Sequence, residues 1–382
     1  MKNKAAIFLA GIMGLNLILT LIGINWGLPD RWCVDEQAAN SLKLLASGSI
    51  FSVVTNVHPQ LYNLFLGALF IPYIALKKII GFPLLDAASM AGISWMEMAH
   101  NYPGFATQIY LIARVSSVCL SILTLYLLYR IAKIMHGKKP ALFACLTLGV
   151  SMGFVETNHL AKHTSLVVFL VLLVLFFCLK AVTKIMHMRR YIYLASFTCG
   201  LAATAKLDGI ISSLFILGAF VYFAFQNKFH GHSEERIKLI TMKFMLACAL
   251  LFAAGVLTGW PAVLVSFERY YQTRYTNNGI FYGGFHKPSL PYLFAVAEKF
   301  KDSVILLVRN FSLPLGVFVF CGIWDFLRNI RKYPYAAVIG TMLIPYIFIC
   351  LAYFTEYPGI STKLIVHAIV IFSIFSGKVI AD

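Results

Sequence analysis

The feature that most constrains this chain is a series of apolar stretches, each long enough to cross a lipid bilayer as a helix. A spanning helix needs about 20 mostly apolar residues, and such stretches recur from one end of the sequence to the other. The predicted spanning helices are 5–25, 107–129, 140–157, 164–183, 191–206, 210–226, 240–260, 303–324, 334–354 and 361–380. The sequence therefore predicts an all-α, polytopic membrane protein with about ten transmembrane helices.

Composition supports this prediction, because the 382 residues contain too little polar material to cover a soluble protein. Charged residues make up only 12% of the chain, whereas they make up about 25% of a soluble domain. A net charge of +17 also occurs in proteins that bind nucleic acid. Here, however, Lys and Arg lie in short loops between apolar stretches, without zinc-finger spacing or an aromatic RNA-binding pattern. We therefore expect a membrane protein and no nucleic-acid partner.

The basic loops predict how the helices are oriented. Loops rich in Lys and Arg face the cytoplasm, and four loops are of this kind: 130–139, 184–190, 228–243 and 328–332. Successive loops must lie on opposite sides of the membrane. All four basic loops lie on the cytoplasmic side only if the apolar stretch 59–80 makes no net crossing of the membrane. We therefore predict a re-entrant or interfacial helix there, on the outer face. Pro72 within the stretch and Lys77-Lys78 at its end are consistent with this prediction.

The predicted organisation is a single transmembrane domain over residues 1–382. Its two large outer loops are 26–106, which contains juxtamembrane helices, and 261–302. The stretch 5–25 is expected to be an uncleaved first helix, because it is long enough to span and no small-residue cleavage site follows it.

Two adjacent acidic residues, Asp35 and Glu36, stand out in the first outer loop, because the whole chain has only 15 acidic residues. One interpretation is that Asp35 caps a short amphipathic helix at 36–46, with its carboxylate accepting free N–H groups. The other interpretation is that these carboxylates take part in a catalytic reaction. A His-Pro step, His58-Pro59, follows before the next apolar stretch.

Several short motifs occur in a characteristic order along the chain. They are Asp35-Glu36, Leu-Ala-Ser-Gly-Ser at 45–49, His58-Pro59, Ile-Ala-Arg114-Val-Ser-Ser, Asn158-His159-Leu-Ala-Lys162-His163 and Ala205-Lys206. This order resembles the type C glycosyltransferases, which include the protein O-mannosyltransferases and the bacterial lipid A aminoarabinose transferases. The resemblance covers residues 1 to about 230. It implies an enzyme that takes a sugar from a polyprenyl phosphate.

The resemblance also implies roles for individual residues. Asp35 is expected to be the general base that takes the proton from an acceptor hydroxyl, while Glu36 orients it or binds the acceptor. Arg114 is expected to bind the donor phosphate, on which negative charge builds up as it leaves, with His58 and Lys206 as helpers. Attack from the side opposite the phosphate would invert the anomeric centre.

One position departs from the pattern, because His163 stands where several relatives carry a second acidic residue. This departure bears on a site with two carboxylates and on any metal that they would bridge. A divalent metal stays an open alternative, although the sequence does not indicate one or any other cofactor. Glu156 either replaces that acid or faces the lipid headgroups. His159 and His163 share a helix face, but no acidic third ligand accompanies them. The possible accessory residues of the site are therefore Glu156, His159, Lys162 and His163.

Other candidates keep two interpretations. Lys206 either helps to bind phosphate or extends to the headgroups, with Asp208 as its ion-pair partner. The aromatic segment 270–282 is either an interfacial belt or a lid over an acceptor site.

We predict a glycosyltransferase of the bacterial inner membrane, whose active site faces the periplasm or exterior. Its partners would be membrane lipid, a polyprenyl-phosphate sugar donor and a hydroxyl acceptor on a protein, glycolipid or polysaccharide. The alternatives are a transporter or flippase of a lipid-linked substrate, or a catalytically silent relative. The polar candidates gather at one face and no internal repeat is visible, which favours the enzyme over a transporter.

Overall fold

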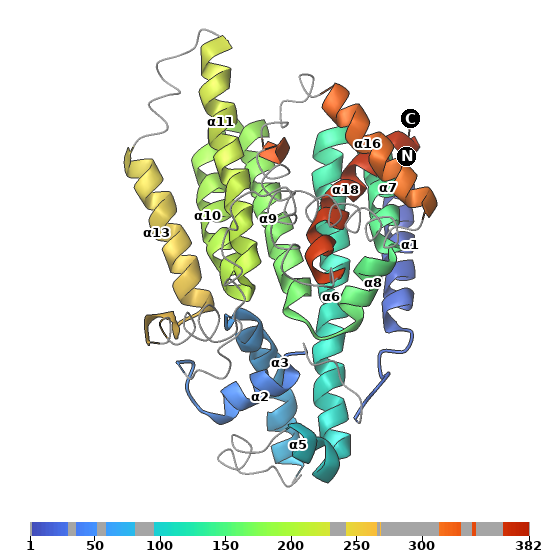
Figure 1. Ribbon diagram of the computed structural model, residues 1–382, viewed down its shortest axis with the longest axis vertical. Helices are drawn as coiled ribbons and strands as arrows, with labels where there is room; N and C mark the ends of the chain where they lie inside the picture. Colours follow the sequence, from blue (N-terminus) through green and yellow to red (C-terminus); the bar gives the residue numbers. More distant parts are fainter. Residues whose placement is uncertain are drawn as a thin grey trace, which may run out of the picture.

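The computed structural model describes residues 2–29, 36–51, 59–80, 95–229, 242–265, 268, 313–329, 338–340 and 362–381. Every regular element within these ranges is a helix, which confirms the all-α prediction. Most of the long helices run roughly side by side along the longest axis of the molecule, and a smaller group lies at one end (Figure 1).

Three neighbouring helices form the centre of the molecule: α6 (Pro103–His136), α9 (His163–Thr183) and α10 (Met188–Ala205). Helix α9 is apolar along nearly its whole length, and residues on all of its sides are buried. That pattern is typical of a helix surrounded by other helices. Around this centre lie α1 (Lys2–Leu21), η1 (Ile185–His187), η2 (Leu207–Ser212), α11 (Ser213–Phe229) and α13 (Met242–Gly259).

Helix α6 is longer than the predicted 107–129. It begins with Pro103, a residue whose fixed φ suits the first helical turn. It continues through the basic segment predicted as a loop and ends at Gly137, whose φ of 91° favours glycine. The basic segments after α6 and α9 lie at the same end as the N-terminus (Figure 1). That arrangement agrees with the predicted alternation.

Helices α10 and α13 approach closely through two glycines. A Cβ atom on Gly200 would lie 2.2 Å from the carbonyl oxygen of Phe252, and one on Gly255 would lie 2.2 Å from that of Phe197. Small residues that let backbones meet are common where membrane helices pack. No side chain fits at either position without a shift of the backbone.

Six helical segments in the described part of the chain are long and apolar enough to cross a membrane. They are 4–21, 61–79, 103–136, 163–183, 207–224 and 242–259. The protein is therefore an integral membrane protein. The predicted stretches 191–206 and 361–380 form α10 and α18 (Thr362–Ala381), and 303–324 overlaps α16 (Leu313–Arg328). Except for 338–340, the stretch 334–354 lies outside the described residues, so the number ten is not confirmed.

The predicted helix 140–157 is wrong in one respect, because it is broken. Helix α7 (Lys138–Gly149) and helix α8 (Met152–His159) meet at 60°. At the break, the side-chain amide of Asn16 on α1 donates a hydrogen bond of 2.8 Å to the carbonyl oxygen of Gly149. Ser121 on α6 in turn donates to Asn16 Oδ1 at 2.9 Å. These buried side chains give the interrupted backbone a partner.

The predicted juxtamembrane region forms the smaller group of helices: α2 (Ala38–Ala46), α3 (Leu61–Ile79) and α5 (Trp95–Asn101). They lie beside the lower part of α6 in Figure 1, below the ends of α10 and α13. A Cβ atom on Gly259, at the end of α13, would lie 3.4 Å from Leu61 at the start of α3. Helix α3 is apolar enough to cross a membrane, and its interfacial location stays a prediction.

The last helices pack against the N-terminal half of the chain. Phe326 of α16 and Phe375 of α18 have ring centroids 4.7 Å apart, and Asp325 forms an ion pair with Lys378. Gly377 lies against the backbone of α7. The second predicted outer loop, 261–302, lies outside the described residues apart from 261–265 and 268.

Candidate active site

A buried ion pair joins the first loop to the helix bundle. The Nε atom of Arg114 donates to Glu36 Oε1 at 2.8 Å, and its Nη2 atom donates to Glu36 Oε2 at 3.0 Å. Arg114 is 0% exposed and Glu36 is 3% exposed. The two side chains therefore meet in the parallel, two-bond geometry in which a guanidinium binds a carboxylate most strongly.

Two backbone carbonyls accept hydrogen bonds from Nη1 of Arg114. The Nη1 atom donates to the carbonyl oxygens of Ile24 at 2.6 Å and Trp26 at 2.9 Å. These carbonyls belong to the turn that follows α1, where Gly23 and Gly27 have φ values of 72° and 76°. Glycine adopts this left-handed conformation without strain. The turn can therefore fold back so that its carbonyls face Arg114.

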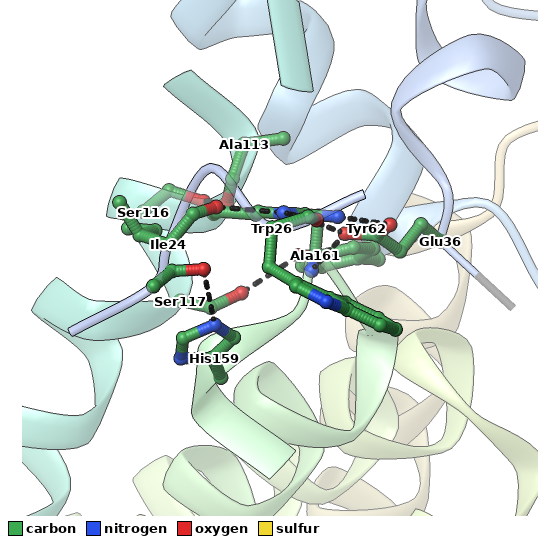
Figure 2. A network of polar contacts seen from close by, with 11 residues as sticks. Ile24, Trp26, Glu36, Tyr62, Ala113, Ser116, Ser117, His159 and Ala161 are labelled. Carbon is green, nitrogen blue, oxygen red and sulfur yellow. Dashed lines mark hydrogen bonds and ion pairs between the residues drawn. The ribbon is translucent and has the colours of Figure 1, made fainter. Parts of the chain in front are cut away.

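Glu36 also holds the segment that connects α8 with α9. Its Oε1 atom accepts a hydrogen bond of 2.9 Å from the backbone N–H of Ala161. In return, the N–H of Gln37 donates to the carbonyl oxygen of Ala161 at 3.1 Å. His159 contacts the carbonyl oxygen of Gly23 through Nε2 at 2.9 Å. Three segments that are distant in sequence thus meet at one carboxylate (Figure 2).

Helix α3 is fixed to α6 beside this ion pair. The hydroxyls of Tyr62 and Ser117 are hydrogen-bonded at 3.2 Å, and both residues are buried. Ser41 of α2 donates to Asn63 Oδ1 at 3.1 Å, which ties α2 to α3. The side chains around Glu36 are therefore held by packing and hydrogen bonds on several sides.

An apolar groove of about 500 Å³ runs between α3 and α6. Its walls are almost entirely hydrocarbon, with Phe65 and Leu69 on one side and Val115 and Leu123 on the other. Ser116 is part of the lining and is the sequence neighbour of Ser117, which contacts Tyr62. The groove therefore begins close to the polar cluster and can accept a hydrocarbon chain.

The predicted site residues lie in different places. Asp35 and His58 lie outside the described residues, although Asp35 directly precedes Glu36 in the chain. Arg114 contacts Glu36 and carbonyl groups, so this geometry supports a role in positioning the loop. The three contacts that Glu36 accepts favour the orienting role among its two predicted roles.

The accessory candidates are also separated. Glu156 is exposed, whereas Lys162 and His163 are buried at the start of α9. Lys206 forms an ion pair with Asp208, as its second interpretation expected. Within the described residues, no three His, Cys, Asp or Glu side chains are grouped so that they could hold a metal. The residues that the structure describes thus form no metal site, and we derive no step through a metal.

The expected helix at 36–46 begins slightly later than predicted. Helix α2 starts at Ala38, and its N-cap position is occupied by Gln37, which makes no side-chain capping bond. Sequence reasoning did not single out Ala161, Ile24 and Trp26. They act through backbone groups, which leave no signature in residue type.

Comparison with known proteins agrees with this architecture. A family model for dolichyl-phosphate-mannose-protein mannosyltransferases matches residues 107–258. No curated protein matches the sequence. The crystal structure of ArnT from Cupriavidus metallidurans bound to undecaprenyl phosphate matches with a TM-score of 0.62 and 16% identity, over 97% of this chain and 59% of ArnT.

A second match is the archaeal oligosaccharyltransferase AglB from Archaeoglobus fulgidus, in complex with an inhibitory peptide and a dolichol-phosphate. Its TM-score is 0.57 at 12% identity, over 98% of this chain and 50% of AglB. This chain thus spans less than two thirds of the length of either protein. Its fold is that of the type C glycosyltransferase superfamily, which confirms the resemblance found in the sequence.

Proposed function

We propose that this protein transfers a sugar from a polyprenyl-phosphate donor to a hydroxyl acceptor at the outer face of the membrane. The observation that carries the proposal is the Glu36–Arg114 ion pair, which holds the residue next to Asp35 against α6 and the start of α9. A catalytic carboxylate must be held accurately to be effective. The pair provides that support for the neighbouring residue.

Asp35 is the proposed general base. Its carboxylate takes the proton from the acceptor hydroxyl while the hydroxyl oxygen attacks the anomeric carbon and the bond to the phosphate breaks. Glu36 is unsuited to this role, because its two oxygens already accept hydrogen bonds from Arg114 and Ala161. Attack opposite the leaving phosphate inverts the anomeric centre. We propose that Glu36 and Arg114 are positioning residues.

The proposed donor has an apolar tail and an anionic head. Support comes from the groove between α3 and α6, which is lined by hydrocarbon and begins beside the polar cluster. Further support comes from the two matched structures, since ArnT was solved with undecaprenyl phosphate and AglB with a dolichol-phosphate. His58 and Lys206 remain proposed helpers at the phosphate. The acceptor is proposed to be a protein, a glycolipid or a polysaccharide.

The proposed location is the bacterial inner membrane, with the Asp35 side facing the periplasm. The argument is the distribution of charge, because the basic segments after α6 and α9 lie at the end of the molecule opposite α2, α3 and α5 (Figure 1). The proposed site would then open on the side where lipid-linked sugars are used.

The test is transfer of radiolabelled sugar from a polyprenyl phosphate in membranes that contain the wild type or Asp35→Asn. We expect Asp35→Asn to lower the transfer rate by at least about a hundredfold at equal amounts of protein. Equal transfer by the two proteins would remove Asp35 from the mechanism. If neither protein transfers label but labelled lipid moves between leaflets of proteoliposomes, the protein is a transporter.

A further inference from the structure

A lysine whose stem is mostly buried lies at the start of α9. Lys162, which directly precedes this helix, is only 7% exposed. Its ammonium group makes no ion pair or hydrogen bond with any residue that the structure describes. Lys206, by contrast, is similarly buried but forms an ion pair with Asp208. The Nζ atom of Lys162 is not among the fully buried polar atoms that lack a partner, so the ammonium group reaches the protein surface and an anion can approach it.

Two buried hydroxyls follow in the first turn of the same helix. Thr164 is 0% exposed and Ser165 is 2% exposed, and neither hydroxyl has a hydrogen-bond partner among the described residues. Elsewhere in this protein a buried helical hydroxyl donates to the carbonyl four residues earlier, as Thr157 and Ser196 do. In the first turn no helical carbonyls lie behind the side chain, so this local partner is missing.

The helix end itself attracts negative charge. Helix α9 has 21 residues, and its first turn contains no acidic residue. Lys162 occupies the N-cap position and makes no capping bond, since a lysine ammonium cannot accept one. The N–H group of Ser165 donates to the carbonyl oxygen of Lys162 at 3.3 Å. The N–H groups of His163 and Thr164 and the positive end of the helix dipole therefore remain available to an anion.

This helix end is adjacent to the proposed catalytic loop. Ala161, the residue before Lys162, exchanges two backbone contacts with Glu36 and Gln37. The carboxylate of Glu36 does not disfavour an anion here, because its charge is balanced by Arg114. An anion bound at the start of α9 would thus lie near the residue that follows Asp35.

We propose that Lys162, Thr164 and Ser165, with the first N–H groups of α9, form a phosphate-binding subsite. The ligand class is a phosphate ester, in which the oxygens accept from one ammonium, two hydroxyls and the backbone N–H groups. Its assignment to the phosphate of a lipid-linked sugar donor rests on the proposed function. Free inorganic phosphate has the same chemistry and is distinguished by the test.

The test measures binding to the full-length protein in lipid nanodiscs, using undecaprenyl phosphate, undecaprenol and inorganic phosphate as probes. Lys162→Met should weaken binding of undecaprenyl phosphate by about tenfold or more and leave binding of undecaprenol unchanged. The double variant Thr164→Val/Ser165→Ala should weaken it in the same selective way. Matched controls are Lys184→Met, at the other end of α9, and Ser196→Ala, whose hydroxyl donates to a backbone carbonyl.

A second readout separates binding from folding. Because the hydroxyl of Thr164 has no partner among the described residues, Thr164→Val should unfold at the same or a higher temperature without ligand. The rise in unfolding temperature that undecaprenyl phosphate causes should be smaller than in the wild type. If the hydroxyl of Thr164 served only the fold, Thr164→Val would unfold at a lower temperature without ligand. The rise in unfolding temperature caused by undecaprenyl phosphate would then be as large as in the wild type.

The possible outcomes are distinct. Wild-type affinity for both undecaprenyl phosphate and inorganic phosphate, in the Lys162 variant and in the double variant, overturns the subsite, even if sugar transfer is intact. Selective loss of binding without any sugar transfer by the wild type supports the subsite and rejects the proposed function. If the variants lose only inorganic phosphate, the subsite stands and its assignment to the lipid donor falls.

Discussion

The guanidinium of Arg114 and the carboxylate of Glu36 face each other through two hydrogen bonds of 2.8 and 3.0 Å, in a place where both residues are buried. The contact joins a loop residue to the first half of the long, mostly apolar helix α6. Its main consequence is that neither residue can be replaced alone without leaving an unbalanced charge in the interior.

Removing Arg114 should therefore destabilise the protein strongly. We expect Arg114→Met to lower the free energy of unfolding by about 3–5 kcal/mol, measured by thermal unfolding in detergent with a calibrated denaturant series. The double variant Arg114→Met/Glu36→Gln should recover part of that loss, because no charge is left without its partner. A double variant less stable than the sum of both single variants would contradict the proposed role of the pair.

Arg114→Lys tests whether geometry matters as well as charge. Lysine carries one compact ammonium and cannot form two parallel bonds to Glu36 while also donating to Ile24 and Trp26. We expect a loss of sugar transfer of about tenfold or more, with a smaller loss of stability than in Arg114→Met. Wild-type transfer by Arg114→Lys would show that the charge alone suffices.

The break between α7 and α8 should depend on Asn16. Asn16→Ala removes the donor to the carbonyl of Gly149 and leaves that buried group unsatisfied, which should cost about 1–3 kcal/mol in thermal unfolding. Thr20→Ala is a suitable control, since its hydroxyl only donates to carbonyls within its own helix. Equal effects of the two substitutions would argue against a specific role for Asn16.

The close contact of α10 and α13 predicts that Gly200 tolerates no side chain. Gly200→Ala places a methyl group 2.2 Å from the carbonyl oxygen of Phe252, and we expect a loss of stability of about 1–3 kcal/mol. The control is Gly14→Ala in α1, where nothing lies within 4 Å of the added carbon. Gly14→Ala should be neutral or slightly stabilising. Thermal unfolding of both variants decides between these expectations.

The groove between α3 and α6 can be tested through the length of the donor. Val115→Trp fills part of the groove, so transfer from a long polyprenyl-phosphate sugar should fall while transfer from a short-chain analogue stays nearly unchanged. The matched variant Leu146→Trp lies on α7, away from the groove, and is also exposed. Equal loss with donors of both lengths would mean that the groove holds no tail.

Much of the fold could be predicted because apolar length and loop charge are properties of the sequence itself. The helices at 164–183, 191–206 and 240–260 appear close to where the apolar stretches predicted them. The break in 140–157 could not be predicted, since it depends on Asn16, which is more than a hundred residues away in the chain. A polar residue within an apolar stretch was the only signal.

The candidate site was predictable in its members and less so in their contacts. Arg114 and Glu36 were selected by residue type and motif, but a guanidinium suits a phosphate and a carboxylate equally well. Only the structure shows that the guanidinium of Arg114 contacts the carboxylate of Glu36. The hydroxyls of Thr164 and Ser165 gave no signal, because their significance lies in the hydrogen bonds that they do not make among the described residues.

The Arg114–Glu36 pair also has a consequence for how the chain is made. Synthesis begins at the N-terminus, so the carboxylate is produced 78 residues before the guanidinium. An arginine in the middle of an apolar helix costs about 2.5–3.5 kcal/mol to insert into a membrane. Because its acidic partner has already been made, α6 can lower that cost as soon as it folds beside the first loop. Assembly of this membrane protein would then have a fixed order, in which the loop must be in place before α6 is stable.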